Sequence, residues 1–252
     1  MHDWKVRFKA AGIHLGISLA VAALAALLVF GVWYPYPYRE LSGGRELFLI
    51  LVTVDVILGP LITLAIFTPV KPRNVLRRDL AVVGLIQLAA LGYGLWTVFV
   101  ARPVHLVFEI DRFRVVHAID VPSDLMDQVP AGIDALPLRG PTPLSVRPFR
   151  DRKESGDATL AALQGIALGA RPDLWEPYEA GRARLLQAAR PVEQLKSRFA
   201  PRAGEIDAAM SRAGRQASNT VYLPLAGRKA FWTAFVDPAT GQVVAFLPLD
   251  SF

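Results

Sequence analysis

The chain has 252 residues, no cysteine, a formal net charge of +6 and a hydrophobic fraction of 53%. Without cysteine it can form no disulfide, thiolate nucleophile, iron–sulfur cluster or thiolate zinc site. The charge excess lies in residues 1–101, with nine Lys/Arg against five Asp/Glu, whereas residues 102–252 hold 19 against 17. A nucleic-acid-binding domain would carry a basic stripe of its own, so we predict no nucleic-acid partner.

Three apolar runs occupy residues 10–32, 47–67 and 80–101, and no comparable run follows them. Each is close to the roughly 20 residues that a helix needs to cross a bilayer. We therefore predict a membrane protein with a three-helix transmembrane domain over residues 1–101 and a soluble domain over residues 102–252. An odd number of crossings would place the two ends of the chain on opposite sides of the membrane.

The basic residues that flank these runs are distributed unevenly. The loop between the first two runs carries only Arg39 and Arg45, and a glutamate follows each of them. Cytoplasmic flanks are usually the basic ones, which predicts a cytoplasmic N-terminus and a C-terminal domain on the outer side, which is the periplasm if the cell is a Gram-negative bacterium. The outer side would also carry an aromatic belt of Trp33, Tyr34, Tyr36 and Tyr38. The residues that set this topology on the cytoplasmic side are Lys5, Arg7, Lys9, Lys71, Arg73, Arg77 and Arg78.

The first apolar run is longer than a signal-peptide core and ends in Trp33-Tyr34-Pro35, without a small-residue cleavage site. We therefore expect it to remain as a helix. A pilin leader would place a glycine before its cleavage point and a glutamate five residues into the mature helix. Residues 8–20 contain the glycine but no glutamate, so the chain is not itself a pilin.

Asp55 lies near the middle of the second run and is followed by Gly59-Pro60. A carboxylate at bilayer depth costs several kcal/mol unless it faces a partner or water, and Pro60 removes a helix hydrogen bond and favours a kink. Two interpretations remain open. Asp55, Gly59 and Pro60 could contact a helix of another protein, or Asp55 could make a structural hydrogen bond to Gln87 or His14. For His14 we predict an interhelix hydrogen bond rather than a ligand role.

Residues 104–110 alternate between apolar and polar side chains, as in a strand with one buried face. The alternation changes phase after residues 111–112, which indicates a bulge or a tight reversal. Four titratable residues here could suggest a metal site, but their spacing does not converge on one point. We predict a solvated strand face, and no metal site, for His105, Glu109, Asp111 and His117.

The rest of the soluble domain reads as an irregular Pro/Gly-rich segment, then helices, then strands. Residues 121–150 allow one short strand near 144–147, residues 156–215 show helical periodicity, and strands are expected at 221–225, 231–236 and 243–249. The segment 237–241 has the Pro and Gly of a hairpin turn. We predict a small α+β domain with an antiparallel sheet covered by helices on one face.

No catalytic motif is present: the chain has no Gly-x-Ser-x-Gly, P-loop or His-Glu-x-x-His sequence. We therefore expect a binding protein rather than an enzyme, with no catalytic residues, cofactor or small-molecule substrate.

Several stretches in order resemble the TfpX/TfpZ-type accessory proteins of type IV pilins, over essentially the whole chain. They are Asp55–Leu61 (Asp-Val-Ile-Leu-Gly-Pro-Leu), Arg102–Val116, Leu138–Pro141, Tyr222–Leu225 and Val236–Asp250. The resemblance implies an inner-membrane chaperone that binds its cognate type IV major pilin and promotes pilus assembly, without a cofactor. The final Asp250-Ser251-Phe252 stands where that family is expected to have Asp-Pro-Trp.

Two other functions are compatible with the sequence. The segment Phe235–Val243 is slightly similar to PepSY-type domains, which would suggest a membrane-anchored periplasmic regulatory or sensory module. An enzyme acting on lipid or glycan would have to rely on Asp55 and the two histidines near residues 105–117. Neighbouring genes would discriminate among these functions.

Overall fold

The computed structural model describes residues 2–68 and 70–252. The chain forms two compact units. The first contains the chain up to Pro35 and residues Gly44–Ala101, and the second contains Tyr36–Gly43 and Arg102–Phe252. The segment 36–43, which the sequence analysis assigns to the transmembrane domain, therefore lies with the second unit.

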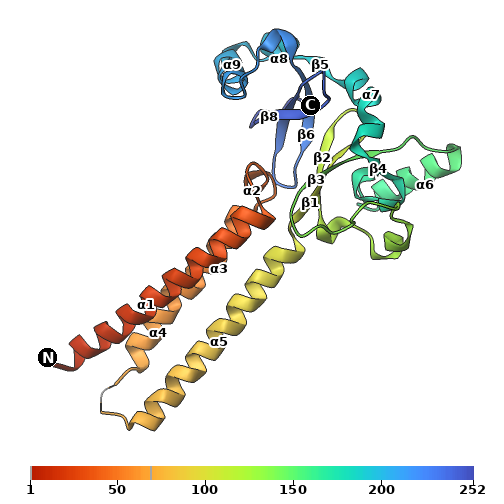
Figure 1. Ribbon diagram of the computed structural model, residues 1–252. Coiled ribbons are helices and arrows are strands. Elements are labelled where there is room, and N and C mark those ends of the chain that lie inside the picture. The colour runs from red at the N-terminus through yellow and green to blue at the C-terminus, as the bar shows by residue number, and fades with distance from the viewer. Residues whose placement is uncertain (1, 69) are drawn as a thin grey trace. The chain divides into compact units, whose positions relative to one another are not determined.

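Three long helical stretches make up the first unit (Figure 1). Within the described residues, three helices are long and apolar enough to cross a membrane, at Trp4–Trp33, Gly44–Ile66 and Arg73–Val100. At most 22% of the most apolar window of each is buried within the unit, so most of the apolar side chains face outward. The elements are α1 (His2–Leu28) with π-helical η1 (Val29–Trp33), α3 (Gly44–Thr53) with π-helical η2 (Val54–Leu58) and α4 (Gly59–Ile66), and α5 (Arg73–Val100).

An eight-stranded sheet forms the centre of the second unit, in the order β4-β3-β1-β2-β6-β7-β8, with β5 paired to β6. Most neighbours are antiparallel, but β1 pairs with β3 and β2 with β6 in parallel. The sheet is therefore mostly antiparallel, which confirms the prediction of an antiparallel sheet in part, and its two parallel pairs were not predicted. The strands are β1 (Pro103–Phe108), β2 (Phe113–His117), β3 (Thr142–Val146), β4 (Trp175–Pro177), β5 (Arg190–Pro191), β6 (Val221–Ala226), β7 (Phe231–Val236) and β8 (Val243–Leu247).

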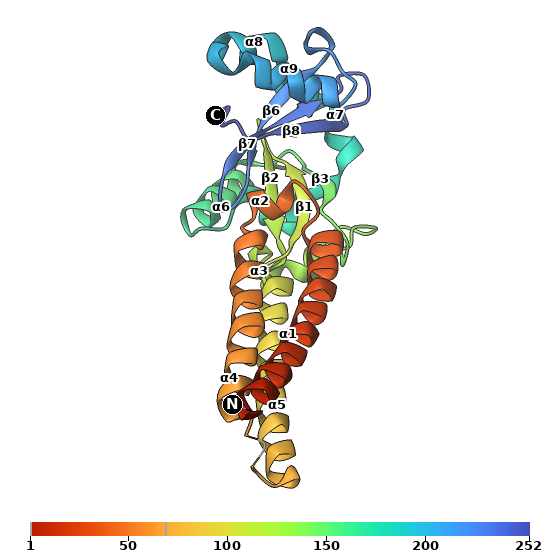
Figure 2. The ribbon, with the colours of Figure 1, turned by 90° about the vertical axis from the view of Figure 1, so that its left-hand side faces the viewer.

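Helices pack on both faces of this sheet, not on one as predicted. Figure 2 shows α8 and α9 beside β6 and β8, where they share a core cluster with Tyr222 and Phe235. The opposite face of β6–β8 packs against α2 and α7, through residues such as Leu41 and Leu185. The helices of this unit are α2 (Tyr38–Leu41), α6 (Arg152–Leu163), α7 (Tyr178–Ala188), α8 (Val192–Arg198) and α9 (Ala203–Arg212). The 3₁₀ turns are η3 (Ala118–Asp120), η4 (Ser123–Gln128), η5 (Leu168–Ala170), η6 (Pro172–Leu174), η7 (Ala200–Arg202) and η8 (Ala217–Asn219).

Coverage of both faces overturns the prediction of a solvated face on the first strand. Every residue of β1 is buried, His105 and His117 are 0% and 1% exposed, and Glu109 is 7% exposed. Glu109 is satisfied internally, because it accepts hydrogen bonds from Arg114 at 2.7 Å and from the backbone N–H of Gly169 at 2.8 Å. Only Asp111, in the reversal between β1 and β2, keeps a half-exposed side chain, paired with Arg112.

The predicted aromatic belt is also only partly present. Tyr34 is fully buried in the first unit and donates a hydrogen bond of 3.0 Å to the carbonyl of Val98. Tyr38 is 9% exposed and packs against Phe246 within the second unit. These two rings fill cores, whereas Tyr36 remains 58% exposed.

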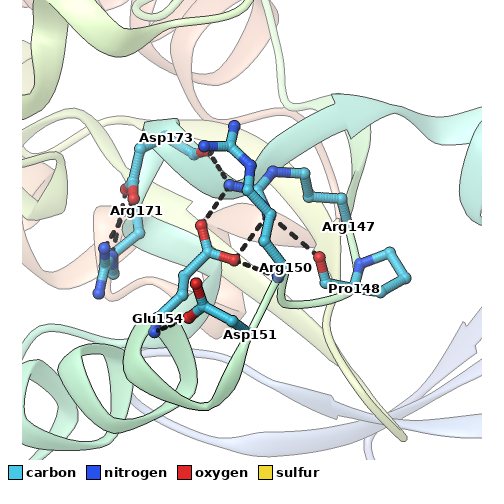
Figure 3. A network of polar contacts seen from close by, with 7 residues as sticks. All are labelled: Arg147, Pro148, Arg150, Asp151, Glu154, Arg171 and Asp173. Atoms are coloured by element: carbon cyan, nitrogen blue, oxygen red, sulfur yellow. Dashed lines mark hydrogen bonds and ion pairs between the residues drawn. The ribbon is translucent and has the colours of Figure 1, made fainter.

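The start of α6 is held by a network of ionic and polar contacts (Figure 3). Asp151 caps the helix by accepting the N–H of Glu154 at 2.8 Å. Glu154 accepts two hydrogen bonds from the guanidinium of Arg147, at 2.6 and 2.9 Å, and one from the N–H of Arg150 at 2.6 Å. The hydrogen bonds from Arg147 lower the pKa of Glu154 to about 2. Side-chain capping of this kind satisfies helix N–H groups that have no partner within the helix.

Candidate functional site

Asp55 lies in the π-helical turn η2, between α3 and α4. In a π-helix each carbonyl pairs with the N–H five residues later, and five residues after Asp55 the chain has Pro60, which has no N–H. The side-chain amide of Gln87, on α5, lies 3.4 Å from both the carbonyl oxygen and the Oδ1 of Asp55. Gln87 thus provides a polar partner for both groups, although both contacts are long.

The neighbouring polar groups of the first unit are paired more closely. The Nδ1 of His14 lies 2.5 Å from the hydroxyl of Thr63, which is buried. This contact confirms the interhelix hydrogen bond predicted for His14. Gly59 is buried where the helices approach one another closely: a Cβ there would lie 2.0 Å from Gln87 Nε2 and 3.1 Å from His14 Nε2. Pro60 follows in the first turn of α4.

An apolar groove of about 400 Å³ runs between the second and third helical stretches of the first unit. A smaller groove of about 220 Å³ lies between the first and third. Asp55 and Gln87 line both grooves, so the polar pair can be reached from two sides of the helices. The larger groove is lined by apolar side chains from Leu47 to Ile62 and from Ile86 to Val98, and Thr97 and Tyr93 add polar groups.

Gly94, on α5, also belongs to this region. A Cβ at Gly94 would lie 1.9 Å from Leu51 Cδ1, so glycine permits close approach of α5 and α3. The helical spacing of Gln87, Gly94 and Thr97 is the signal that could have indicated one face of α5. The other residues of α5 in this region are mostly apolar, so the spacing of these three residues is a weak signal in the sequence.

The basic residues that flank the helices gather at the ends of α1, α4 and α5. Arg7 donates a hydrogen bond of 2.7 Å to Thr68, and Lys71 pairs with Asp79 at 2.8 Å. The remaining five, whose side chains are exposed, are Lys5, Lys9, Arg73, Arg77 and Arg78.

In the second unit, no group of three or more metal-ligating side chains comes together among the described residues. His105, Glu109, Asp111 and His117 are held by separate partners rather than around one point. Phe252 contacts Phe231 at 5.1 Å between ring centroids, and the guanidinium of Arg112 lies over its ring. The final aromatic side chain is thus packed against the second unit.

Comparison with known proteins identifies relatives over nearly the full length. The chain is 33% identical over 246 residues to the fimbrial assembly protein of serogroup I of Dichelobacter nodosus, covering 97% of this chain and 95% of that protein. The serogroup E1 protein is 32% identical with the same coverage. The protein of serogroups C1 and C2 is 41% identical over 122 residues, which is 48% of this chain and 91% of that protein.

A family model described as the fimbrial assembly protein FimB matches residues 2–43. This match begins with α1 and ends with the last residue of the segment that lies in the second unit. No solved structure matches the chain. From the near full-length similarity to the Dichelobacter nodosus proteins, we conclude that the chain belongs to the family of these fimbrial assembly proteins.

Proposed function

We propose that this protein is a non-catalytic accessory protein of the TfpX/TfpZ type, which binds its cognate type IV major pilin in the inner membrane and promotes pilus assembly as a chaperone. The names of its relatives support a role in fimbrial assembly rather than in PepSY-like regulation. The three apolar helices support membrane insertion. In this proposal the N-terminus is cytoplasmic and the domain formed by residues 102–252 is periplasmic.

The groove beside Asp55 is the observation that carries the proposal. A pilin subunit in the membrane presents one apolar helix, and an apolar groove between two helices is a surface on which such a helix can pack. Asp55 and Gln87 interrupt the apolar lining with one acceptor and one donor. The contacts between Asp55 and Gln87 are 3.4 Å long. The two side chains can therefore give up these contacts and form shorter hydrogen bonds to a polar group on an incoming helix. Gly59 also lines the groove, and Pro60 follows it in the first turn of α4.

Photocrosslinking at matched positions tests the groove. Ile86 and Ile50 line it and are 64% and 66% exposed, whereas the adjacent Leu85 and Leu49 are 69% and 53% exposed and lie outside it. A photoreactive amino acid at Ile86 or Ile50 should crosslink to the major pilin in cells. The same amino acid at Leu85 or Leu49 should not. Equal crosslinking at all four positions would contradict a specific groove.

Substitution of the polar pair tests its part in recognition. Asp55→Leu and Gln87→Leu should each reduce co-purification of the pilin, whereas Asp79→Asn removes a carboxylate outside the groove and should leave it unchanged. If Asp55→Leu retains pilin at the level of the unsubstituted protein, the polar contact is discarded.

A further inference from the structure

The edge of β2 continues beyond the strand that pairs with it. β6 pairs with β2 only at Phe113↔Leu225 and Arg114↔Ala226, after which β6 turns back into β7. Residues Val115–His117 therefore have no strand beside them on this edge in the part of the chain that the structure describes. They are at most 4% exposed, and the N–H of His117 already donates to Asp120 Oδ2 at 3.1 Å, so an added strand would pair with the remaining backbone groups. An unpaired strand edge offers backbone donors and acceptors to an added strand.

A cavity of about 410 Å³ lies at this unpaired edge. Its walls are residues 114–117 of β2, the loop 164–167 after α6, and Gly227 and Arg228 in the turn between β6 and β7. A second hollow of about 580 Å³ shares Arg114, Gly165 and Ala167 with the first and continues along α6 toward the β1–β2 reversal. The two hollows form one groove, and the contacts in Figure 3 anchor the start of the helix that borders it.

His117 lines this cavity and contains a polar atom without a partner. The side chain is 1% exposed, its Nδ1 lies 3.0 Å from Asp120 Oδ2, and among the described residues its buried Nε2 has no hydrogen-bond partner. Burial lowers the pKa of His117, so the ring is neutral near pH 7. The ring proton then lies on Nδ1 and is donated to Asp120, which leaves Nε2 as an acceptor that lacks a donor.

The charges beside the cavity argue against an anion as its ligand. Arg114 is paired with Glu109 at 2.7 Å, and Arg228 with Asp120 at 2.5 Å. Each cation is therefore already neutralised by a carboxylate. A neutral ligand with an N–H donor matches both the free acceptor of His117 and the strand edge that no other strand pairs. An extended peptide backbone has these properties.

We propose that an extended peptide segment of the partner protein binds in this groove as an added strand along residues 115–117 of β2, with an N–H group directed to Nε2 of His117. Given the proposed function, on which this inference rests, the segment belongs to the soluble head of the pilin. The second unit would then recognise the head, while the helices of the first unit recognise the pilin helix.

Peptide binding to the full chain tests this inference. Fluorescein-labelled peptides that tile the soluble head of the cognate pilin are titrated with the protein in detergent micelles, and anisotropy is measured. Gln164→Trp places a large ring in the cavity wall, whereas Leu163→Trp alters the neighbouring, 81% exposed residue, which does not line it. At least one peptide should bind, and Gln164→Trp should weaken it about tenfold or more while Leu163→Trp leaves it within about twofold.

Hydrogen exchange provides the second measurement and does not depend on a substitution. The bound peptide should slow amide exchange in segments 113–117 and 164–167. Equal affinity of both tryptophan variants, or protection confined to other segments, overturns the inference.

The outcomes also separate this inference from the proposed function. If no head peptide binds while the intact pilin still crosslinks at Ile86, the inference about the groove beside β2 fails and the proposed function stands. If head peptides bind as expected but crosslinking at Ile86 is absent, the proposal for the helices fails instead.

Discussion

The backbone N–H of Lys229 donates a hydrogen bond of 2.9 Å to the carbonyl oxygen of Leu41. These residues are far apart in sequence, and two long helical stretches separate them. Leu41 is fully buried in the core cluster that also contains Leu225 and Trp232. The short segment 36–43 therefore contributes Leu41, together with Tyr38, to the core of the second unit.

The close contact at Gly227 gives the first prediction. A Cβ on Gly227 would lie 2.8 Å from the carbonyl oxygen of Leu41 and 2.9 Å from that of Ala230. Backbone atoms cannot move aside as a flexible side chain can, so Gly227→Ala should lower the free energy of unfolding by about 1–3 kcal/mol. Gly156→Ala is the control: nothing lies within 4 Å of its Cβ position within α6, and it should stabilise by roughly 0.5–1 kcal/mol. Urea unfolding followed by tryptophan fluorescence measures both, and equal effects would contradict the close contact.

The second prediction concerns the pH dependence that His105 creates. Burial lowers the pKa of His105 from 6.5 to about 4. Its Nε2 lies 3.0 Å from the carbonyl oxygen of Ala135 and must carry the proton, so Nδ1 accepts from the hydroxyl of Thr142 at 2.7 Å. Between pH 6.5 and about 4 the unfolded chain binds a proton that the folded chain does not, so stability should fall as the pH falls through this window. The loss should reach on the order of 3 kcal/mol.

The test compares the midpoint of urea unfolding at pH 7 and pH 5 for the unsubstituted chain and for His105→Gln. Glutamine can still donate to Ala135 but does not titrate, so the variant should be less sensitive to pH. His117, whose pKa burial also lowers, should supply part of the remaining dependence. An unchanged slope in His105→Gln would show that the histidine is not the source.

The third prediction concerns the approach of the helices at Gly59. In Gly59→Ala the new methyl group must displace the amide of Gln87, which lies 2.0 Å from the Cβ position. Because that amide is the end of a flexible side chain, we expect loss of its contact with Asp55 rather than unfolding. Capture of the pilin should fall as it does in Gln87→Leu. In Gly92→Ala, where nothing lies within 4 Å and which lines neither groove, capture should not change.

A double substitution separates the clash from a general loss of stability. Gln87→Ala removes the side chain that the new methyl group would displace, so adding Gly59→Ala to it should cost little more in capture or in melting temperature. The coupling between the two changes is the measured quantity. If the two losses simply add, Gly59 does not act through Gln87.

The fourth prediction concerns orientation. If Lys5, Arg7, Lys9 and the basic residues of the second loop face the cytoplasm, alkaline phosphatase fused after Phe252 should be active. The same enzyme fused after Pro72 should be inactive, and green fluorescent protein should show the opposite pattern at both positions. Fluorescence from a fusion after Phe252 would reverse the proposed topology.

Much of the fold could be predicted from sequence where the pattern is local. The three apolar stretches, the strand at residues 231–236 and the turn at 237–241 follow from length, periodicity and turn residues. The reversal near residues 111–112 is also confirmed, since Glu109 donates its N–H to the carbonyl of Arg112 at 2.9 Å. Strands of two or three residues, such as β4 and β5, are too short to produce a periodic signal.

The failures concern burial that distant segments create. His105 looks solvated in an alternating strand, but Ala135 of the irregular segment before β3 and Thr142, the first residue of β3, cover it. The groove beside Asp55 could be predicted only in part, since the sequence suggested Gln87 as a partner but not which face of α5 borders it. In each case the covering residues come from a part of the chain that the local pattern does not include.

The position of segment 36–43 has a consequence for synthesis and for fragments. This segment emerges from the ribosome well before strands β1–β8. Leu41 can therefore pack against Leu225 and Trp232 only when synthesis of the chain is nearly complete. A recombinant fragment that starts at Arg102 would lack Leu41 and Tyr38 and would have a cavity in its core. Joining residues 36–43 to such a fragment through a flexible linker should fill that cavity and give a soluble form suitable for crystallisation.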